Sequence, residues 1–274
     1  MTIFQSILLG IVQGLTEFLP ISSSAHLVLL PYFLGWEIPI SQAFIFDVLV
    51  QVATLLGVVA YFWSDLTMIA SAVVKSLWRR QPLADPQSRL GWFILLACLP
   101  AGVIGLAVKD LVEKTFDSPL ATAFFLFGTA CLMVVAEIQG KRIRDFEQIK
   151  WFDALWIGFF QALAIFPGLS RSGATISGGM LRNLDRPSAA RFSFLLSVPI
   201  LLAAGAVVLP DLIKLPDLGS VLPAFIPGFI AAAVVGYLSI RWLLGYLARR
   251  SLYIFAIYCT GLALTTLVVF FVRG

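Results

Sequence analysis

Charged residues are scarce in this chain of 274 residues: Asp, Glu, Lys and Arg together make up 12% of it. A soluble domain carries about a quarter charged residues. Hydrophobic residues make up 60%, and they gather in long runs. These features exclude an ordinary soluble fold, and the continuous rather than alternating runs argue against a transmembrane β-barrel. The sequence therefore predicts an all-α integral membrane protein.

Cysteine and histidine are also rare, with three Cys and one His. Cys98, Cys131 and Cys259 each lie inside an apolar run, so their spacing indicates neither a disulfide nor a metal site. The net charge of +4 resides in short loops between apolar runs, which argues against nucleic acid as a partner. The N-terminus lacks a cationic region and a small-residue cleavage site, so no removable signal peptide is expected.

Eight apolar segments organise the chain. Six of them approach the length of about 17–25 residues that a spanning helix needs: 44–63, 91–108, 120–136, 192–209, 222–241 and 253–272. The other two, 4–34 and 152–181, are interrupted by Pro20 and Pro167. Arms of about 15 residues reach only about 22 Å, so these segments are predicted to be re-entrant helix–break–helix hairpins. An amphipathic stripe over 65–78 is expected at the membrane interface.

The two interrupted segments are copies of each other. A constant offset along the chain pairs Gln13 with Gln161, Phe18 with Phe166, Ser22 with Ser170 and Ser24 with Ser172, and shorter offsets pair Pro100 with Pro227 and Gly128 with Gly261. We therefore predict one membrane domain, 1–274, with internal repeats of about 1–140 and 150–274. Each repeat holds three spans, so the second is inverted, and the broken helices should meet near the middle of the membrane.

Basic residues gather in alternate loops, at 75–89, 141–150, 182–191 and 241–250. The positive-inside rule places these loops in the cytoplasm. The basic loops all fall on one side of the membrane only if the chain has six spans and two re-entrant hairpins. The N-terminus and the first hairpin are then expected on the outside, whereas the second hairpin enters from the cytoplasm. Asp47, Glu137 and Asp153 lie near span ends and are expected to be structural.

The break in the first hairpin is rich in polar residues, which are costly at membrane depth and mark functional sites. They are Gln13, Glu17, Ser22, Ser23, Ser24 and His26. Glu17 is predicted to be a metal ligand or an acid/base group, with a purely structural hydrogen bond as the alternative. Gln13 lies one helical turn before it, on the same face. The three serines either cap the second arm or bind phosphate at its start.

His26 is predicted to be a general acid/base near neutral pH, with a capping or hydrogen-bonding role as the alternative. Ser23 lies three residues earlier, so its hydroxyl and the imidazole can approach on one helical face. We therefore predict Ser23 as the nucleophile and His26 as its base. Direct attack by His26 stays open.

The break in the second hairpin centres on an arginine. Its polar residues are Ser170, Arg171, Ser172, Gly173 and Thr175. Arg171 lies at the hairpin tip, far from the loops, which argues against a side chain that snorkels to the interface. The planar guanidinium matches phosphate, and exposed backbone amides would add to it. The segment is predicted to be a phosphate cradle.

These motifs resemble those of the bacitracin-resistance family of undecaprenyl-diphosphate phosphatases. The first family motif, Glu/Gln-x-x-x-Glu, then Pro and Ser-Ser-x-x-His, matches Gln13, Glu17, Pro20, Ser22, Ser23 and His26. The second, Pro-Gly-x-Ser-Arg-Ser-x-x-Thr, matches Pro167, Gly168, Ser170, Arg171, Ser172 and Thr175. The resemblance implies hydrolysis of the lipid diphosphate to the monophosphate carrier with a divalent cation, Mg²⁺ or Ca²⁺. Because the first position of the motif is Gln13 rather than Glu, Glu17 is the one carboxylate of the motif, which argues against a metal site built from two carboxylates.

The resemblance also implies partners and a location. The partners are an isoprenyl diphosphate lipid, membrane lipids and a second copy in a homodimer. The location is the bacterial cytoplasmic (inner) membrane, with the site open to the periplasmic side, where the enzyme recycles the carrier lipid for cell-wall synthesis and confers bacitracin resistance. A flippase of the monophosphate lipid stays open, because inverted repeats with broken helices are typical of transporters. A Ser/His intramembrane protease would leave Arg171 unexplained.

Overall fold

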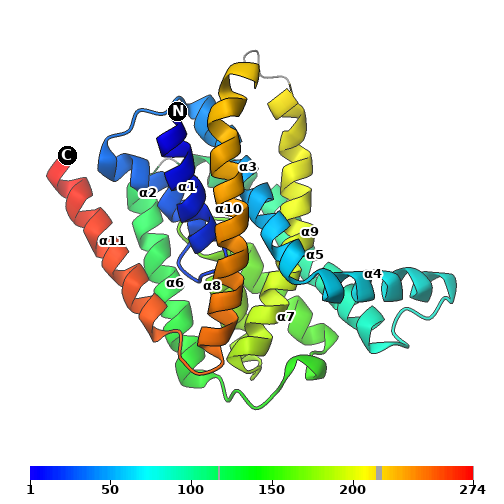
Figure 1. Ribbon diagram of the computed structural model, residues 1–274. Helices are drawn as coiled ribbons and strands as arrows, with labels where there is room; N and C mark the ends of the chain where they lie inside the picture. Colours follow the sequence, from blue (N-terminus) through cyan, green and yellow to red (C-terminus); the bar gives the residue numbers. More distant parts are fainter. Residues whose placement is uncertain (117, 214–217, 274) are drawn as a thin grey trace.

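The computed structural model describes residues 1–116, 118–213 and 218–273, which form an all-helical bundle (Figure 1). The helices are α1 (Ile3–Thr16), α2 (Ser23–Leu34), α3 (Ile40–Tyr61), α4 (Trp63–Trp78), α5 (Pro86–Phe116), α6 (Pro119–Gln139), η1 (Phe146–Gln148), α7 (Trp151–Leu163), α8 (Arg171–Leu181), α9 (Arg186–Ile213), α10 (Leu218–Leu247) and α11 (Tyr253–Arg273). Within these residues the β-structure is limited to an isolated bridge between Arg144 and Leu184.

Five helices of the described residues are long and apolar enough to cross a membrane. Their spanning parts are Pro86–Val108, Pro119–Gln139, Arg186–Ala206, Leu222–Leu247 and Tyr253–Arg273. The α3–α4 pair is a sixth candidate, bent by 85° between Tyr61 and Trp63. The predicted all-α membrane fold is thus confirmed. In Figure 1, α4 runs across the direction of the bundle helices, as expected for a helix at the interface.

Both interrupted segments form helix–break–helix hairpins. The chain breaks between Thr16 and Ser23 in the first and between Leu163 and Arg171 in the second. Their arms have 14, 12, 13 and 11 residues, too short to cross a hydrocarbon core of about 30 Å. Figure 1 shows α1 and α2 at the end that holds both chain termini, and α7 at the opposite end. Six spans with two re-entrant hairpins require both termini on one side.

The same helix contact is built twice. α1 packs on α10, and α7 packs on α5. A Cβ atom on Gly10 would come within 2.2 Å of the Gly228 carbonyl oxygen, and one on Gly158 within 2.5 Å of the Ala97 carbonyl oxygen. Small residues let backbones approach this closely in membrane helix pairs. Gly10 and Gly158 are equivalent positions of the predicted repeat, and the inverted duplication stays a prediction.

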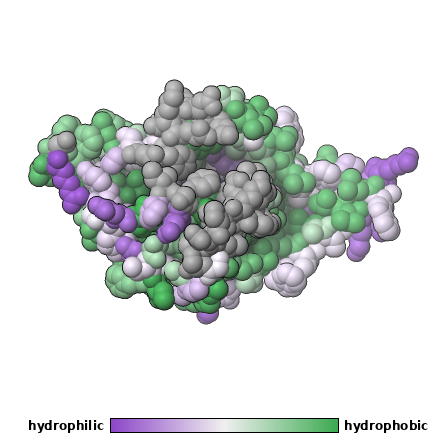
Figure 2. All heavy atoms as spheres, turned by 90° about the horizontal axis from the view of Figure 1, so that it is seen from above, coloured by the Kyte–Doolittle hydropathy of each residue, from purple (hydrophilic) through white to green (hydrophobic). Residues whose placement is uncertain are grey.

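The outer surface of the bundle is apolar. Leu106, Phe271 and Val272 are 83%, 73% and 79% exposed, in three of many such cases. Seen from above in Figure 2, apolar atoms extend around the flanks, and α4 projects to one side with hydrophilic atoms at its tip. Such surface would be a large exposed patch in water, but lipid tails cover it in a bilayer.

Two buried carboxylates, Glu137 and Asp153, form ion pairs with arginines at the end of the bundle opposite the chain termini. Glu137 accepts a hydrogen bond from Arg186 at 2.5 Å, and Asp153 accepts from Arg144 at 2.6 Å and Arg182 at 2.8 Å. Burial would raise the pKa of Asp153, but the hydrogen bonds from Arg144 and Arg182 hold this pKa below its usual range. These side chains hold the base of the second hairpin, which is the structural role expected for them.

The topology predicts which loops a membrane-impermeant thiol reagent reaches. A cysteine in place of the exposed Glu37 should react in intact cells, whereas one in place of the exposed Gln81 should react only after the membrane is opened. The parent protein is the control for its own three cysteines. Labelling of both positions from the same side would contradict the predicted topology.

Candidate functional site

The tips of the two hairpins meet inside the bundle. Arg171 donates from Nη2 to Oε1 of Glu17 at 2.6 Å. The Ser172 hydroxyl donates to the carbonyl oxygen of Leu19 at 2.9 Å, and each of these bonds joins one hairpin to the other. The structure therefore assembles the polar residues of both motifs into one site, as their repeat relationship predicts.

Glu17 is the centre of this site. It is 8% exposed, and its carboxylate accepts three hydrogen bonds. Besides Arg171, Gln13 donates from Nε2 to Oε2 at 2.9 Å and the Ser23 hydroxyl donates to the same oxygen at 2.6 Å. The sequence assigned Glu17 to metal or proton chemistry and Arg171 to phosphate. The structure shows that the two form one partly buried ion pair, which offsets part of the cost of taking each charge out of water.

Arg171 keeps one nitrogen without a partner. Its Nη1 is buried and has no hydrogen-bond acceptor within the described residues, and Oε1 of Gln13 is likewise without a donor. A buried donor left unpaired costs about 1–3 kcal/mol, and more when it is charged. The site is therefore built to receive an acceptor at Nη1, and a phosphate oxygen would form a charge-assisted bond there.

Both hairpins present a helix start at this point. Ser22 caps α2 by accepting from the amide of Ala25 at 3.3 Å, and Ser170 caps α8 by accepting from the amide of Gly173 at 3.1 Å. The first two amides of each helix make no hydrogen bond to the part of the chain that the structure describes. Unpaired amides at a helix start attract anions.

The hydroxyl groups predicted to bind phosphate already have protein partners. The Oγ atoms of Ser22 and Ser24 lie 3.2 Å apart, and those of Ser170 and Ser172 lie 3.1 Å apart. Oγ of Ser24 also accepts a hydrogen bond from the amide of Gly168 at 3.4 Å. Thr175 is 1% exposed, and its hydroxyl lies 2.6 Å from that of Ser193 in α9. These groups, with Gly173, hold the tips in shape, and their contact with phosphate stays a prediction.

The expected hydrogen bond between Ser23 and His26 is not found. Ser23 donates to Glu17 instead, while Nδ1 of His26 lies 2.7 Å from the carbonyl oxygen of Ser22 and Nε2 lies 2.7 Å from the hydroxyl of Tyr258. Ser22 adopts a φ of +68°, a strained conformation that often marks a functional site. The helical spacing is as predicted, but a carboxylate from the other arm is the stronger acceptor.

Two side chains from outside the motifs complete the site. On α6, Thr129 donates to the carbonyl oxygen of Gly168 at 3.1 Å and accepts from the amide of Ser170 at 2.9 Å. On α11, Tyr258 contacts His26. Sequence reasoning missed both, although the match of Gly128 with Gly261 places these helices in equivalent positions.

Comparison with known proteins identifies the family. Residues 6–265 match the family model described as bacitracin resistance protein BacA. The chain belongs to the BacA family. A curated relative from Chlorobium phaeovibrioides is 45% identical over 94% of this chain and 93% of its own length. One from Desulforudis audaxviator is 41% identical over 99% of both, and one from Rubrobacter xylanophilus is 44% identical over 95% and 96%. Each relative is named undecaprenyl-diphosphatase.

The donor set of this BacA-family site does not fit a cation held by the protein alone. In residues 1–116, 118–213 and 218–273, no three His, Cys, Asp or Glu side chains are grouped so as to hold a metal. Both oxygens of Glu17 already accept hydrogen bonds, and the guanidinium of Arg171 beside them repels a cation. Oε1 of Gln13, by contrast, has no hydrogen-bond donor among the residues that the structure describes.

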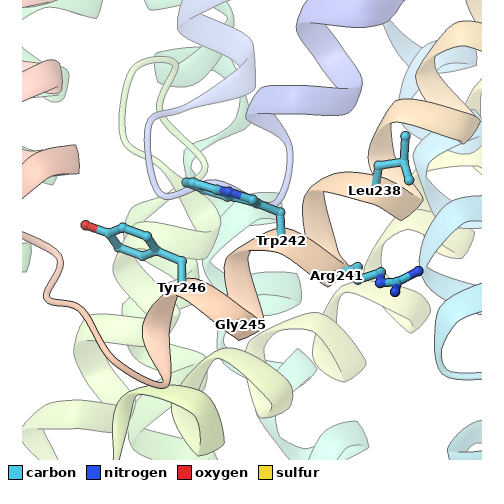
Figure 3. A pocket seen from close by; sticks show the side chains of 5 residues that line it. All are labelled: Leu238, Arg241, Trp242, Gly245 and Tyr246. Carbon is cyan, nitrogen blue, oxygen red and sulfur yellow. The ribbon is translucent and has the colours of Figure 1, made fainter.

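A depression on the flank of α10 is separate from this site. Leu238, Arg241, Trp242, Gly245 and Tyr246 line it, and the rings of Trp242 and Tyr246 stack with centroids 5.2 Å apart (Figure 3). None of the predicted site residues belongs to its lining. Aromatic and basic side chains near a helix end are typical of the membrane interface.

Proposed function

We propose that this protein hydrolyses undecaprenyl diphosphate to undecaprenyl phosphate and inorganic phosphate. The observation that carries the proposal is the guanidinium of Arg171. Its Nη2 donates to Glu17, and its Nη1 has no acceptor within the described residues, beside the Ser23 hydroxyl and two helix starts. A pure lipid carrier needs a phosphate cradle, but it needs no activated hydroxyl. The names of the BacA-family relatives agree with the phosphatase and not with the flippase.

We assign a role in the reaction to each residue from its contacts. Nη1 of Arg171 and the free amides hold the terminal phosphate, because phosphoryl transfer depends mainly on positioning and charge stabilisation. Oγ of Ser23 attacks the phosphorus and passes its proton to Oε2 of Glu17. The bond from phosphorus to the bridging oxygen breaks, and the lipid monophosphate leaves. Water then attacks the phosphorus and gives its proton to Nε2 of His26. The bond from phosphorus to Oγ breaks, Ser23 regains the proton held by Glu17, and phosphate is released.

Direct attack by His26 is the alternative within the same function. Its attacking atom would be Nε2, because Nδ1 faces the carbonyl oxygen of Ser22. The two routes leave different intermediates: phosphoserine survives acid, whereas phosphohistidine does not. Acid quenching of a reaction with labelled substrate therefore distinguishes them.

Ser23→Ala is expected to lower kcat by roughly 1,000-fold or more, since removal of a nucleophile abolishes the covalent route. The change is measured as phosphate release, with the exposed Ser71→Ala as the control. Turnover of Ser23→Ala close to that of the parent protein would refute the serine route and move the covalent role to His26.

Phosphate release by the purified protein in detergent tests the function itself. Detergent removes the two compartments that transport requires, so a flippase would release nothing. We expect phosphate from undecaprenyl diphosphate in this assay. Absence of release together with lipid transfer in vesicles would replace the phosphatase by the flippase.

We propose that the divalent cation, Mg²⁺ or Ca²⁺, is retained by the phosphates of the substrate. Mg²⁺ in particular is commonly bound through substrate phosphates, waters and one or two carboxylates. Within the site, Oε1 of Gln13 is an uncommitted oxygen for such a cation, and Glu17 is the nearby carboxylate.

We also propose that the protein resides in the bacterial cytoplasmic membrane with its site open to the periplasmic side. The first hairpin carries Glu17, Ser23 and His26, and it lies at the end of the bundle that holds the chain termini (Figure 1). The basic loop 141–150 and the connection from α10 to α11, in which the basic segment 241–250 ends, lie at the other end. The site then opens to the side on which cell-wall synthesis releases lipid diphosphate, and the homodimer stays a prediction.

A further inference from the structure

The hydrogen bonds of His26 define which of its nitrogens is basic. Nδ1 lies 2.7 Å from the carbonyl oxygen of Ser22. A carbonyl oxygen only accepts, so Nδ1 carries a proton whether the ring is neutral or charged. In the neutral ring the accepting atom is therefore Nε2. This atom faces the hydroxyl of Tyr258 at 2.7 Å rather than the hydroxyl of Ser23.

Tyr258 holds the imidazole in two ways. Its ring stacks on that of His26, with centroids 5.6 Å apart and an interplanar angle of 6°. Its hydroxyl donates to Nε2 when the imidazole is neutral and can rotate to accept from Nε2 when the imidazole is charged. The next residue, Cys259, donates from Sγ to the carbonyl oxygen of Pro20 at 3.7 Å. α11 therefore contacts the first hairpin on both sides of the serine break.

Comparison of the two repeats indicates that the hydroxyl of Tyr258 is linked to the presence of His26. The offset that pairs Gly128 with Gly261 also pairs Phe125 with Tyr258. Phe125 stacks on Phe166 of the second hairpin, with centroids 5.0 Å apart and an interplanar angle of 18°. Each hairpin is thus packed by an aromatic ring from the equivalent helix. Packing alone needs only the ring, which Phe125 supplies.

The two hairpins also differ at the position of His26. The hairpin offset pairs His26 with Ala174, so the second hairpin has no imidazole at the equivalent position. The ring that packs on the hairpin with the histidine, Tyr258, carries a hydroxyl, and the ring that packs on the hairpin without one, Phe125, does not. A hydroxyl required for packing would be expected on both rings.

We propose that Tyr258 is a positioning residue that acts through His26, holding Nε2 as the nitrogen that takes the proton of the water that cleaves the phosphoserine and then returns this proton to solvent. The proposal rests on the phosphatase function proposed above. It assigns to α11 a part in the reaction that neither polar motif contains. A proton reaches or leaves His26 only on the side of Tyr258, because Nδ1 stays bonded to Ser22.

Tyr258→Phe tests the role in turnover, because it keeps the ring and removes the hydroxyl. We expect kcat to fall roughly 10- to 100-fold, as for other residues that orient a functional imidazole, with KM little changed. In a His26→Ala background the same substitution should cause no further loss, since Tyr258 acts through His26. Tyr246→Phe is the matched control. An equal loss in both backgrounds, or no loss in either, would overturn the proposal.

Imidazole ¹⁵N NMR tests the contact without relying on activity. The chain has one histidine, so every imidazole signal belongs to His26. We expect a protonated Nδ1 and a hydrogen-bonded Nε2, and Tyr258→Phe should move chiefly the Nε2 signal. An Nε2 signal that is the same with and without the hydroxyl would refute the contact. If the contact is found but the parent protein releases no phosphate, the proposed function fails instead.

Discussion

Arg171→Lys is expected to lower kcat for phosphate release by roughly 100-fold or more, the loss typical of one transition-state donor. Lysine keeps the positive charge but places it on one nitrogen. Arg171 donates from Nη2 to Glu17, and its Nη1 has no acceptor in the part of the chain that the structure describes. A single ammonium group cannot reproduce that fork. The measurement is phosphate release in detergent over a range of substrate concentrations.

The exposed Arg249→Lys is the matched control for this substitution, and it should leave turnover unchanged. Thermal unfolding of the Arg171→Lys protein separates a loss of chemistry from a loss of fold. Near-normal hydrolysis by a folded Arg171→Lys protein would remove Arg171 from the phosphate cradle. It would also remove the observation on which the proposed function depends.

Glu17→Gln is expected to abolish turnover, although the amide has nearly the shape of the carboxylate. Three donors converge on Glu17, from Gln13, Ser23 and Arg171. The amide has one oxygen and one NH₂ group, so at least one donor would face another donor. Arg171 would also lose its counter-charge, and Ser23 would lose the carboxylate oxygen that takes its proton, so the covalent step could not begin.

Phosphate release and thermal unfolding are measured together for this variant, with the exposed Glu147→Gln as the control. Titration of Mg²⁺ or Ca²⁺ into the chelated enzyme adds a second readout. A Glu17→Gln protein that keeps both its activity and its cation dependence would show that the cation ligand lies elsewhere. It would also show that the carboxylate is not needed to hold Ser23 and Arg171.

The two arms of each hairpin could be predicted from local chemistry. Pro20 and Pro167 interrupt apolar runs, and a serine follows within three residues of each, so this pattern favours a helix end before the break and a capped helix after it. α2 begins at Ser23 and α8 at Arg171, each preceded by a serine cap. These are effects of neighbouring residues, and they need no knowledge of the rest of the fold.

The amino-acid sequence by itself determined the membrane class, the candidate spans, the duplication and the two polar motifs. Each of these follows from composition, segment length or residue spacing, which the bilayer and the helix geometry constrain directly. Only the tertiary structure decided which side chains touch. Ser23 is closer in sequence to His26 than to Glu17, yet it donates to Glu17, and Tyr258 contacts His26 from the far end of the chain. Such pairings depend on how the helices pack and which acceptor is stronger, and neither can be read from spacing along one helix.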